Sequence, residues 1–251
     1  MRVVVAGAAG FLGRAVVRAL AGHDVVPIGR GEVAVGDAFV WAAGRREADL
    51  AANRAVHVDA AVAAARASGA SRVVYLSTGE VYGDAPVPWR EDGPVQPRSA
   101  YARTKLDGEA ALADAVVLRI GVVYGPGQAP PMVLPSIVDA VRARRPIALT
   151  AGTQTRDFVF VDDVGDAIAR ALAAPPGVIN IGSGVETRVR DACELLGRLL
   201  GAPELLGFGA RPLRDDDLAR YVLDVTRARD ILGWRASTPL AAGLARLVTI
   251  C

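Results

Sequence analysis

The chain contains a glycine-rich stretch that decides its fold, Met1-Arg-Val-Val-Val-Ala-Gly7-Ala-Ala-Gly10-Phe11-Leu12-Gly13-Arg14. A run of β-branched residues leads into the first glycine, and an amphipathic helical pattern follows the third. In this context Gly7 permits a tight turn, Gly10 lets the backbone approach a pyrophosphate, and Gly13 lets helix and strand pack closely. The N-terminus of the helix would face the negative charge. The stretch therefore predicts a dinucleotide-binding unit.

Downstream of this stretch, short apolar runs alternate with longer alanine-rich helical patterns. This order predicts an α/β fold of the Rossmann type, a doubly wound parallel sheet with helices on both faces. The expected strands are 3–6, 25–28, 39–42, 73–77 and 116–120, and the expected helices are 11–21, 48–68 and 100–112.

One interval in this series is shorter than a parallel crossover normally allows. Only residues 31–38 separate the second strand from the third, whereas such a crossover normally takes about a dozen residues or more. Either a stub at residues 32–35 replaces a full αβ unit, or the two strands join by an unusual route. We therefore expect the sheet to be trimmed here.

The composition of the sequence changes after about Gly125: proline and glycine become more frequent, and the predicted helices and strands become shorter. We expect residues 1–125 to form the dinucleotide-binding core. Residues 126–251 are expected to form mainly a small substrate-binding part, with some elements returning to the core. The elements expected there are helices near 135–143, 162 onward and 189–200, and strands near 147–149 and 178–181.

Composition and charge exclude several classes of function. Hydrophobic residues make up 52% and charged residues 22% of the 251, and the formal net charge is +2. Since the charges are interleaved, we expect no nucleic-acid partner. The longest uncharged stretch, residues 120–138, is broken by proline and glycine and predicts no membrane helix. The two cysteines, Cys193 and Cys251, match no metal-ligand spacing and suit a reducing cytoplasm, and His23 and His57 are interpreted as surface or packing residues.

A candidate catalytic pair stands in the sequence Tyr101-Ala-Arg-Thr-Lys105, which opens a helical pattern. The four-residue spacing places the phenol and the ammonium on one helix face. An ammonium near a phenol favours phenolate and lowers the phenol pKa from about 10. Tyr101 would then exchange a proton with a carbonyl or an alcohol.

Together with the segment Ser77-Thr78-Gly79-Glu80-Val81-Tyr82-Gly83, these motifs resemble the extended short-chain dehydrogenase/reductase family, of the NAD-dependent epimerase/dehydratase type. The resemblance covers nearly the whole chain, which would be a shortened member of this family. It implies that Thr78 orients the reacting oxygen of the substrate, that Lys105 bonds the nicotinamide ribose, and that Glu80 serves as base or substrate contact. Asn53 matches an asparagine that braces the active-site backbone. The expected cofactor-binding residues are Gly7, Gly10, Phe11, Leu12, Gly13, Arg30, Ala42, Ala43, Gly44, Tyr101, Lys105 and Ile120.

The type of cofactor is judged from the end of the second strand, Pro27-Ile28-Gly29-Arg30. No acidic residue stands there to hold the ribose 2′-hydroxyl of NAD. Arg30 could instead face a 2′-phosphate as a charged donor, so NADP is favoured over NAD.

Departures from the family pattern bear on the substrate. Dehydratases of the family carry an aspartate acid at the position of Gly79, so dehydration is disfavoured. Val122 replaces an asparagine that contacts the sugar diphosphate. Arg156 and Arg214 match arginines that bind substrate phosphate, although Asp216 replaces a glycine beside the second and would weaken anion binding. The expected substrate-binding positions are Glu80, Val122, Arg156 and Arg214.

The leading hypothesis is a keto-sugar reductase that acts by hydride transfer on a nucleotide-activated sugar, with Tyr101 protonating the reduced oxygen. A 4-epimerase with tightly held NAD is the first alternative. The others are a sugar-acid decarboxylase, a ketoreductase of a non-sugar metabolite and a non-catalytic dinucleotide sensor. The sequence leaves the oligomeric state open, with a homodimer as one option.

Overall fold

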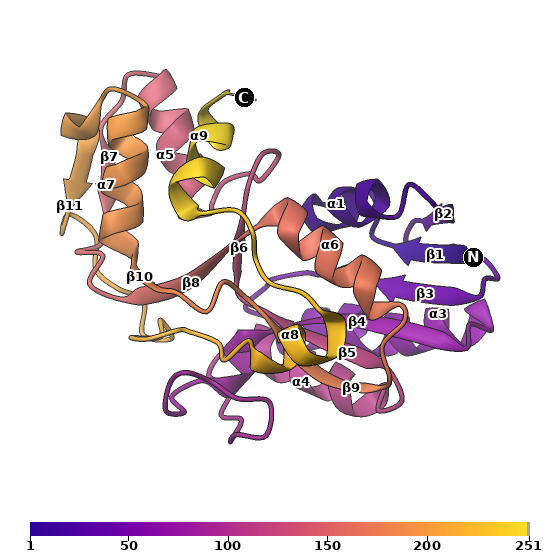
Figure 1. Cartoon of the computed structure of the whole chain (residues 1–251). Helices are drawn as coiled ribbons and strands as arrows, with labels where there is room; N and C mark the ends of the chain where they lie inside the picture. The colour runs from indigo at the N-terminus through magenta and orange to yellow at the C-terminus, as the bar shows by residue number, and fades with distance from the viewer. Residues whose placement is uncertain (250–251) are drawn as a thin grey trace.

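The computed structural model describes residues 1–249, and a six-stranded parallel sheet lies at its centre (Figure 1). The order of the strands is β2-β1-β3-β4-β5-β9, so the direction of winding reverses between β1 and β3. Ligands of open α/β sheets bind at such a switch point, outside the carboxyl ends of the strands. The Rossmann-type prediction is confirmed. The strands are β1 (Arg2–Ala6), β2 (Asp24–Ile28), β3 (Ala38–Trp41), β4 (Arg72–Thr78), β5 (Val116–Ile120) and β9 (Gly177–Ile181).

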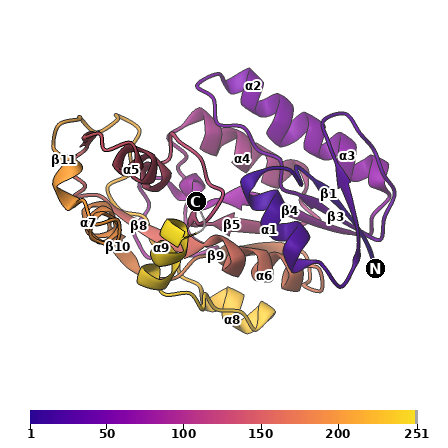
Figure 2. The same ribbon diagram turned by 90° about the horizontal axis from the view of Figure 1, so that it is seen from above.

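Helices cover both faces of this sheet, as Figure 2 shows from above. One face carries α1 (Phe11–Ala19), α6 (Val161–Ala171) and α8 (Thr226–Leu232). The opposite face carries α2 (Leu50–Arg54), α3 (Ala61–Ser68) and α4 (Ala100–Ala111). A π-helical segment, η1 (Ala55–Ala60), joins α2 to α3, so the expected single helix at 48–68 contains an irregular turn.

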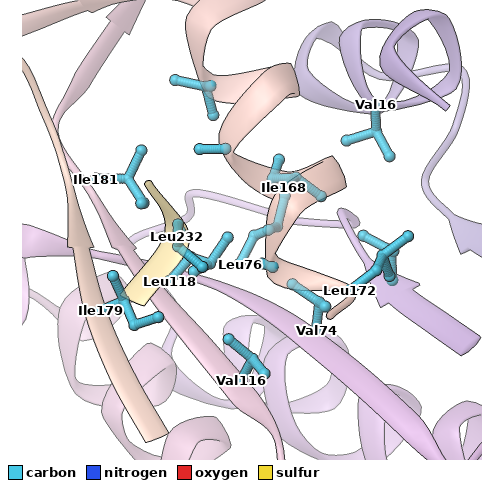
Figure 3. Close-up of a cluster of buried hydrophobic side chains, with 14 of the residues drawn as sticks. Val16, Val74, Leu76, Val116, Leu118, Ile168, Leu172, Ile179, Ile181 and Leu232 are labelled. Carbon is cyan, nitrogen blue, oxygen red and sulfur yellow. The ribbon is translucent and has the colours of Figure 1, made fainter. Parts of the chain in front are cut away.

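The largest apolar cluster lies between the sheet and α6. Figure 3 shows Ile168 of α6 and Leu172, the residue that follows α6, directed at the strands, where Val74, Leu118 and Ile179 are buried. Each fully buried aliphatic side chain of this kind contributes about 1.5–3 kcal/mol relative to an exposed one. This packing fixes the carboxyl ends of the central strands relative to one another.

The crossing from β2 to β3 is made by residues 29–37 without any helix, so the sheet is trimmed as expected. Because β1 lies between the two strands, this segment crosses β1, with a turn at residues 30–31 and no helix or strand. A Cβ atom on Gly36 would lie 2.9 Å from Cγ2 of Val4, which shows how closely the crossing packs on β1. The Asp37 carboxylate accepts a hydrogen bond of 2.7 Å from the backbone N–H of Arg2. The unusual route is therefore correct, and the stub at 32–35 is not formed.

The second half of the chain interleaves with the first. It returns α6, β9 and α8 to the central sheet, and its other elements build a separate cluster with two small sheets, ordered β10-β8-β6 and β11-β7 (Figure 1). Local patterns missed β6, β8, β10, β11, α8 and α9. The elements of the cluster are β6 (Val122–Tyr124), α5 (Val133–Arg142), β7 (Ile147–Leu149), β8 (Thr155–Phe160), β10 (Glu186–Arg188), α7 (Val189–Leu199), β11 (Leu206–Phe208) and α9 (Leu240–Thr249).

Two remaining expectations concern cysteine and the membrane. Cys193 is buried in α7 as a packing residue, and burial raises the pKa of its thiol to about 12. Cys251 lies outside the described residues. Across residues 1–249, no helix combines the length and apolar character needed to cross a membrane.

Candidate active site

The glycine-rich loop packs tightly between β1, residue 43 and α1. Gly7 has a φ of +78°, and a Cβ atom there would lie 2.6 Å from the backbone nitrogen of Ala43. A Cβ atom on Gly13 would overlap the carbonyl oxygen of Gly7. Gly10 precedes α1 as its N-cap and offers no side chain to cap it. The positive end of α1 is thus left to a ligand, as binding of a dinucleotide pyrophosphate requires.

The loop after β3 forms the neighbouring wall. The N–H of Ala42 donates to the carbonyl of Ala6 at 3.0 Å, which ties this loop to the end of β1. A Cβ atom on Gly44 would lie 4.0 Å from Nζ of Lys105, so the same wall reaches the catalytic pair. The expected cofactor residues at these strand ends and at the start of α1 are Gly7, Gly10, Phe11, Leu12, Gly13, Ala42, Ala43, Gly44 and Ile120. Their arrangement fits a dinucleotide.

A carboxylate that the sequence analysis did not consider, that of Glu32, lies next to the end of β2. Arg30 is exposed there, whereas Oε2 of Glu32 accepts a hydrogen bond of 2.6 Å from the backbone N–H of Gly29. Glu32 is four residues beyond Ile28, the last residue of β2, and a turn at residues 30–31 brings its side chain back to the end of the strand. A carboxylate therefore lies next to the end of β2, the strand whose end carries the ribose-binding acid in dinucleotide-binding folds.

The three catalytic candidates come from β4 and α4. Thr78 is buried at the end of β4, and its Oγ1 accepts a hydrogen bond of 3.2 Å from the N–H of Glu80. Tyr101 is half-buried in the first turn of α4, a helix that Ser99 caps. Lys105 is buried one turn later, and its Nζ donates to the carbonyl of Leu76 at 2.7 Å. The amine of Lys105 thus lies next to Gly44, in the loop after β3 that packs on Gly7 of the glycine-rich loop.

The acidities of this pair differ from the expectation. Burial, and then the negative charge of Glu80, raises the pKa of Tyr101 to about 12, against an opposing effect of Arg46. Burial lowers the pKa of Lys105 to about 7. The Lys105 amine points to the Leu76 carbonyl and lies 5.0 Å from the centroid of the Tyr75 ring. Desolvation therefore outweighs the predicted stabilisation of phenolate by Lys105.

Lys105 is the only lysine in the sequence, so its protonation can be followed alone. In protein labelled with ¹³Cε-lysine we expect a single lysine resonance whose titration midpoint is about 7 in the folded state. In the urea-unfolded chain the midpoint should return to about 10.4, the value for free lysine. A folded midpoint above about 9.5, close to the free value, would contradict the effect of burial.

The same shift gives the sign of a stability change. Between about pH 7 and pH 10 the unfolded chain holds a proton on Lys105 that the folded chain has lost. The free energy of unfolding should therefore rise with pH in this window, by up to about 1.4 kcal/mol per pH unit. Urea unfolding of the wild type and of Lys105→Met, measured from about pH 7 to about pH 9.5, isolates this slope, because the variant lacks the titrating group.

Sequence reasoning missed Arg46, which lies over the ring of Tyr101, the candidate acid and base. Its two terminal nitrogens bond the two carboxylate oxygens of Glu80 at 2.7 and 2.8 Å. Its guanidinium carbon lies 4.6 Å from the centroid of the Tyr101 ring. Glu80 is consequently engaged by a bidentate partner.

Two buried polar residues hold the loop that carries Arg46. The side-chain amide of Asn53 accepts from the N–H of Glu47 at 3.0 Å and donates to its carbonyl at 2.8 Å. Nε2 of His57 accepts from the N–H of Arg45 at 3.2 Å, so Nδ1 carries the proton and donates to Oγ1 of Thr104 at 2.8 Å. Burial, with Lys105 nearby, lowers the pKa of His57 to about 3. His57 is thus a neutral packing residue, not a surface one.

Tyr221, also missed, fills the space beside Gly79. A Cβ atom on Gly79 would lie 2.7 Å from the hydroxyl oxygen of Tyr221, which itself donates to the carbonyl of Ile120 at 2.8 Å. A side chain at position 79 would have to displace this phenol. The structure thus leaves no room for the acid that dehydratases carry there.

The predicted phosphate-binding arginines lie in different settings. Arg156 donates to the carbonyls of Thr155 and Leu218, both at 2.7 Å, and pairs with the Asp217 carboxylate. Arg214 is exposed, with its Nε 3.7 Å from an Asp216 oxygen, as in an ordinary surface pair. Val122 begins β6 and is half-buried among apolar side chains. A phosphate reaching Arg156 would share it with Asp217.

Comparison with known proteins places this geometry in a family. Residues 33–182 match the family described as "NAD dependent epimerase/dehydratase family". The chain belongs to this family.

Two curated relatives are 4-epimerases. The UDP-glucose 4-epimerase of Mycolicibacterium smegmatis is 40% identical over 201 residues, which are 74% of this chain and 64% of the relative. The dTDP-L-rhamnose 4-epimerase of Burkholderia thailandensis is 35% identical over 170 residues, which are 61% of this chain and 46% of the relative. The chain thus spans less than two thirds of the length of either relative.

Solved structures resemble the whole chain. MoeE5 in complex with UDP-glucuronic acid and NAD has a TM-score of 0.90 and 29% identity, covering 99% of this chain and 98% of its own. The UDP-glucose 4-epimerase of Thermus thermophilus, in complex with NAD, has a TM-score of 0.88 and 26% identity, covering 100% and 98%. RMD from Pseudomonas aeruginosa, complexed with NADPH, shares the fold at 23% identity and a TM-score of 0.86, covering 99% and 97%.

Proposed function

We propose that the protein is a 4-epimerase of nucleotide-activated sugars that holds its nicotinamide dinucleotide through the whole cycle. The observation that carries the proposal is the set of Thr78, Tyr101 and Lys105 on β4 and α4, with Lys105 next to the loop after β3 that packs on the glycine-rich loop. The relatives named as 4-epimerases support this alternative over the keto-sugar reductase that the sequence favoured.

The chemistry follows from the positions of the three groups. The bound nicotinamide supplies a hydride acceptor and, once reduced, a hydride donor. Tyr101 takes the proton of the sugar hydroxyl as its carbon is oxidised, and returns a proton when the ketone is reduced on its other face. Thr78 holds the reacting oxygen by its hydroxyl. The hydride and proton removed in the first half are both restored in the second, so no external reductant is consumed.

The single lysine supports this assignment. Every other basic site among the 29 lysine and arginine residues holds arginine, yet position 105 keeps an amine. Arginine stays charged at all working pH values, whereas a buried lysine can give up its proton near pH 7. An amine that titrates beside the cofactor cradle suits proton exchange in both directions.

Two neighbouring features weigh against other reactions of the family. Elimination of water lacks its acid, because Gly79 has no side chain and Tyr221 occupies the space. Decarboxylation assisted by Glu80 would need that carboxylate to be free, whereas Arg46 binds both of its oxygens. Hydride transfer is the reaction that the arrangement serves.

We propose NAD as the cofactor, because the Glu32 carboxylate stands at the end of β2. A 2′-phosphate at that point would meet like charge, whereas a 2′-hydroxyl would find an acceptor. We expect the wild type to bind NAD about tenfold or more tightly than NADP, since like-charge contacts cost several kcal/mol. Glu32→Gln should reduce this preference, as measured by calorimetric titration of both dinucleotides. Arg30→Gln is the matched control, and its failure to weaken NADP binding would remove the sequence-based case for NADP.

The proposed activity can be tested without added cofactor. Purified protein should release NAD on denaturation and should interconvert UDP-glucose and UDP-galactose, or dTDP- or uronate analogues, in buffer alone. Carbon-bound deuterium at C4 should be retained in the product, because the hydride returns to the carbon that lost it. Stoichiometric consumption of NADPH with a keto-sugar nucleotide would instead show a reductase.

A further inference from the structure

The sequence pattern assigned the cation near Tyr101 to Lys105, whereas the structure places the guanidinium of Arg46 over the Tyr101 ring. We propose that Arg46 is a cation that stabilises the phenolate of Tyr101 from above its ring, with Glu80 as the counter-charge of Arg46. This inference rests on the proposed role of Tyr101 as acid and base. Arg46 acts through Tyr101 and is therefore a positioning residue.

The placement of the guanidinium carries the first step. It lies 4.6 Å from the centroid of the Tyr101 ring, within the range of a cation–π contact. Ionisation of a phenol spreads negative charge into its ring, so a cation over the ring stabilises the phenolate more than the phenol. By contrast, the Lys105 amine donates to the Leu76 carbonyl and lies over the ring of Tyr75.

The second step is the support given to the Arg46 backbone. Both of its chain neighbours are tied to the helical segment at 50–60, Arg45 through His57 and Glu47 through Asn53. The side chain is tied in turn by two bonds to Glu80. Such support keeps a long side chain in one position, as a preorganised electrostatic group requires. It also assigns a purpose to the buried His57 and Asn53.

The charges that face Tyr101 act in known directions. Glu80 from η2 (Gly79–Tyr82) raises the pKa of Tyr101, and Arg46 from the loop opposes that rise. His57 packs its ring edge 5.3 Å from the Tyr101 ring but is neutral. Other titratable or charged groups lie around Tyr101, Arg46 and Glu80. They are Tyr75 of β4, Lys105 of α4, and Arg156, Asp216 and Tyr221 of the second half of the chain. Arg46 is the side chain among them whose cation stacks on the phenol ring.

Opposite signs for two substitutions make the proposal testable without turnover. 2,3,5-Trifluorotyrosine placed at position 101 titrates several units below tyrosine, and its ¹⁹F resonances report that phenol alone. Arg46→Gln should raise the midpoint by about one unit, a tenfold gain in proton affinity. Arg46→Lys should restore most of the difference. Glu80→Gln should lower the midpoint, because it removes the negative charge.

The control is Arg45→Gln, which removes the neighbouring exposed cation whose Nε pairs with Glu47 at 3.0 Å. It should leave the midpoint unchanged. Equal midpoints for Arg46→Gln and the wild type would overturn the inference, as would a shift of the same size in Arg45→Gln. The Arg46 side chain is 44% exposed, so its replacement should leave the protein folded, which circular dichroism checks. A failed epimerase assay would leave this titration standing, so the two proposals fail separately.

Discussion

Tyr101→Phe should lower kcat for epimerisation by about 10²–10⁴-fold while leaving the affinity for NAD and the unfolding temperature close to those of the wild type. Phenylalanine keeps the ring that packs between Arg46 and His57 and removes only the hydroxyl that exchanges the proton. Steady-state rates with UDP-galactose, calorimetric titration of NAD and thermal unfolding measure the three quantities.

A matched control comes from a second phenol outside the site. Tyr124 is buried in the other part of the molecule, where its hydroxyl faces the carbonyl of Leu240 at 3.4 Å. Tyr124→Phe should change kcat by less than twofold or so, since its hydroxyl touches none of the reacting groups. If Tyr101→Phe kept more than about a tenth of the activity, Tyr101 would not be the acid and base.

Arg119→Met should destabilise the protein by about 3–5 kcal/mol, the largest effect on stability that the structure suggests. Arg119 of β5 and Glu109 of α4 form a pair with an N···O distance of 2.7 Å and with side chains only 6% and 7% exposed. Ser77 also donates to this carboxylate. Loss of the Arg119 guanidinium would leave the carboxylate of Glu109 buried between α4 and β5 with no opposite charge.

Chemical denaturation measures this loss, and two variants calibrate it. Adding Glu109→Gln to Arg119→Met should recover much of the stability, because the buried charge is then gone. Arg18→Met breaks an exposed pair between α1 and Asp162 of α6 and should cost well under about 1 kcal/mol. Equal losses for Arg119→Met and Arg18→Met would contradict the effect of burial.

The sequence predicted the central sheet closely because its strands carry their own local signal. Runs of β-branched residues bounded by glycine or polar residues placed β1, β4 and β5 within one or two residues of their observed bounds. The strands β6, β8 and β10 were missed: β6 and β10 have three residues each, and β8 pairs with these two strands, which lie far from it along the chain. The π-helical segment η1 was missed as well, since it lies inside a pattern that also suits an α-helix.

The candidate site shows the same division. Tyr101, Lys105 and Thr78 were predicted as candidates because their motif and spacing are local. Arg46 and Glu80 are 34 residues apart, and no pattern links a loop arginine to that carboxylate. Arg156 was predicted, but its partner Asp217 lies 61 residues away, so the engaged state of the arginine could not be foreseen.

The geometry of the candidate active site depends on the number of residues in the π-helical segment Ala55–Ala60. A π-helical turn holds an extra residue relative to an α-helix, and Ala55 stands between the two residues that hold the Arg46 loop, Asn53 and His57. Deletion of Ala55 would let the segment rewind as an α-helix and would turn His57 by about 100° relative to Asn53. The two residues would no longer reach the same loop. Substitutions on the exposed face of this helix should therefore be tolerated. Insertion or deletion of a single residue in it would instead move Arg46 away from Tyr101.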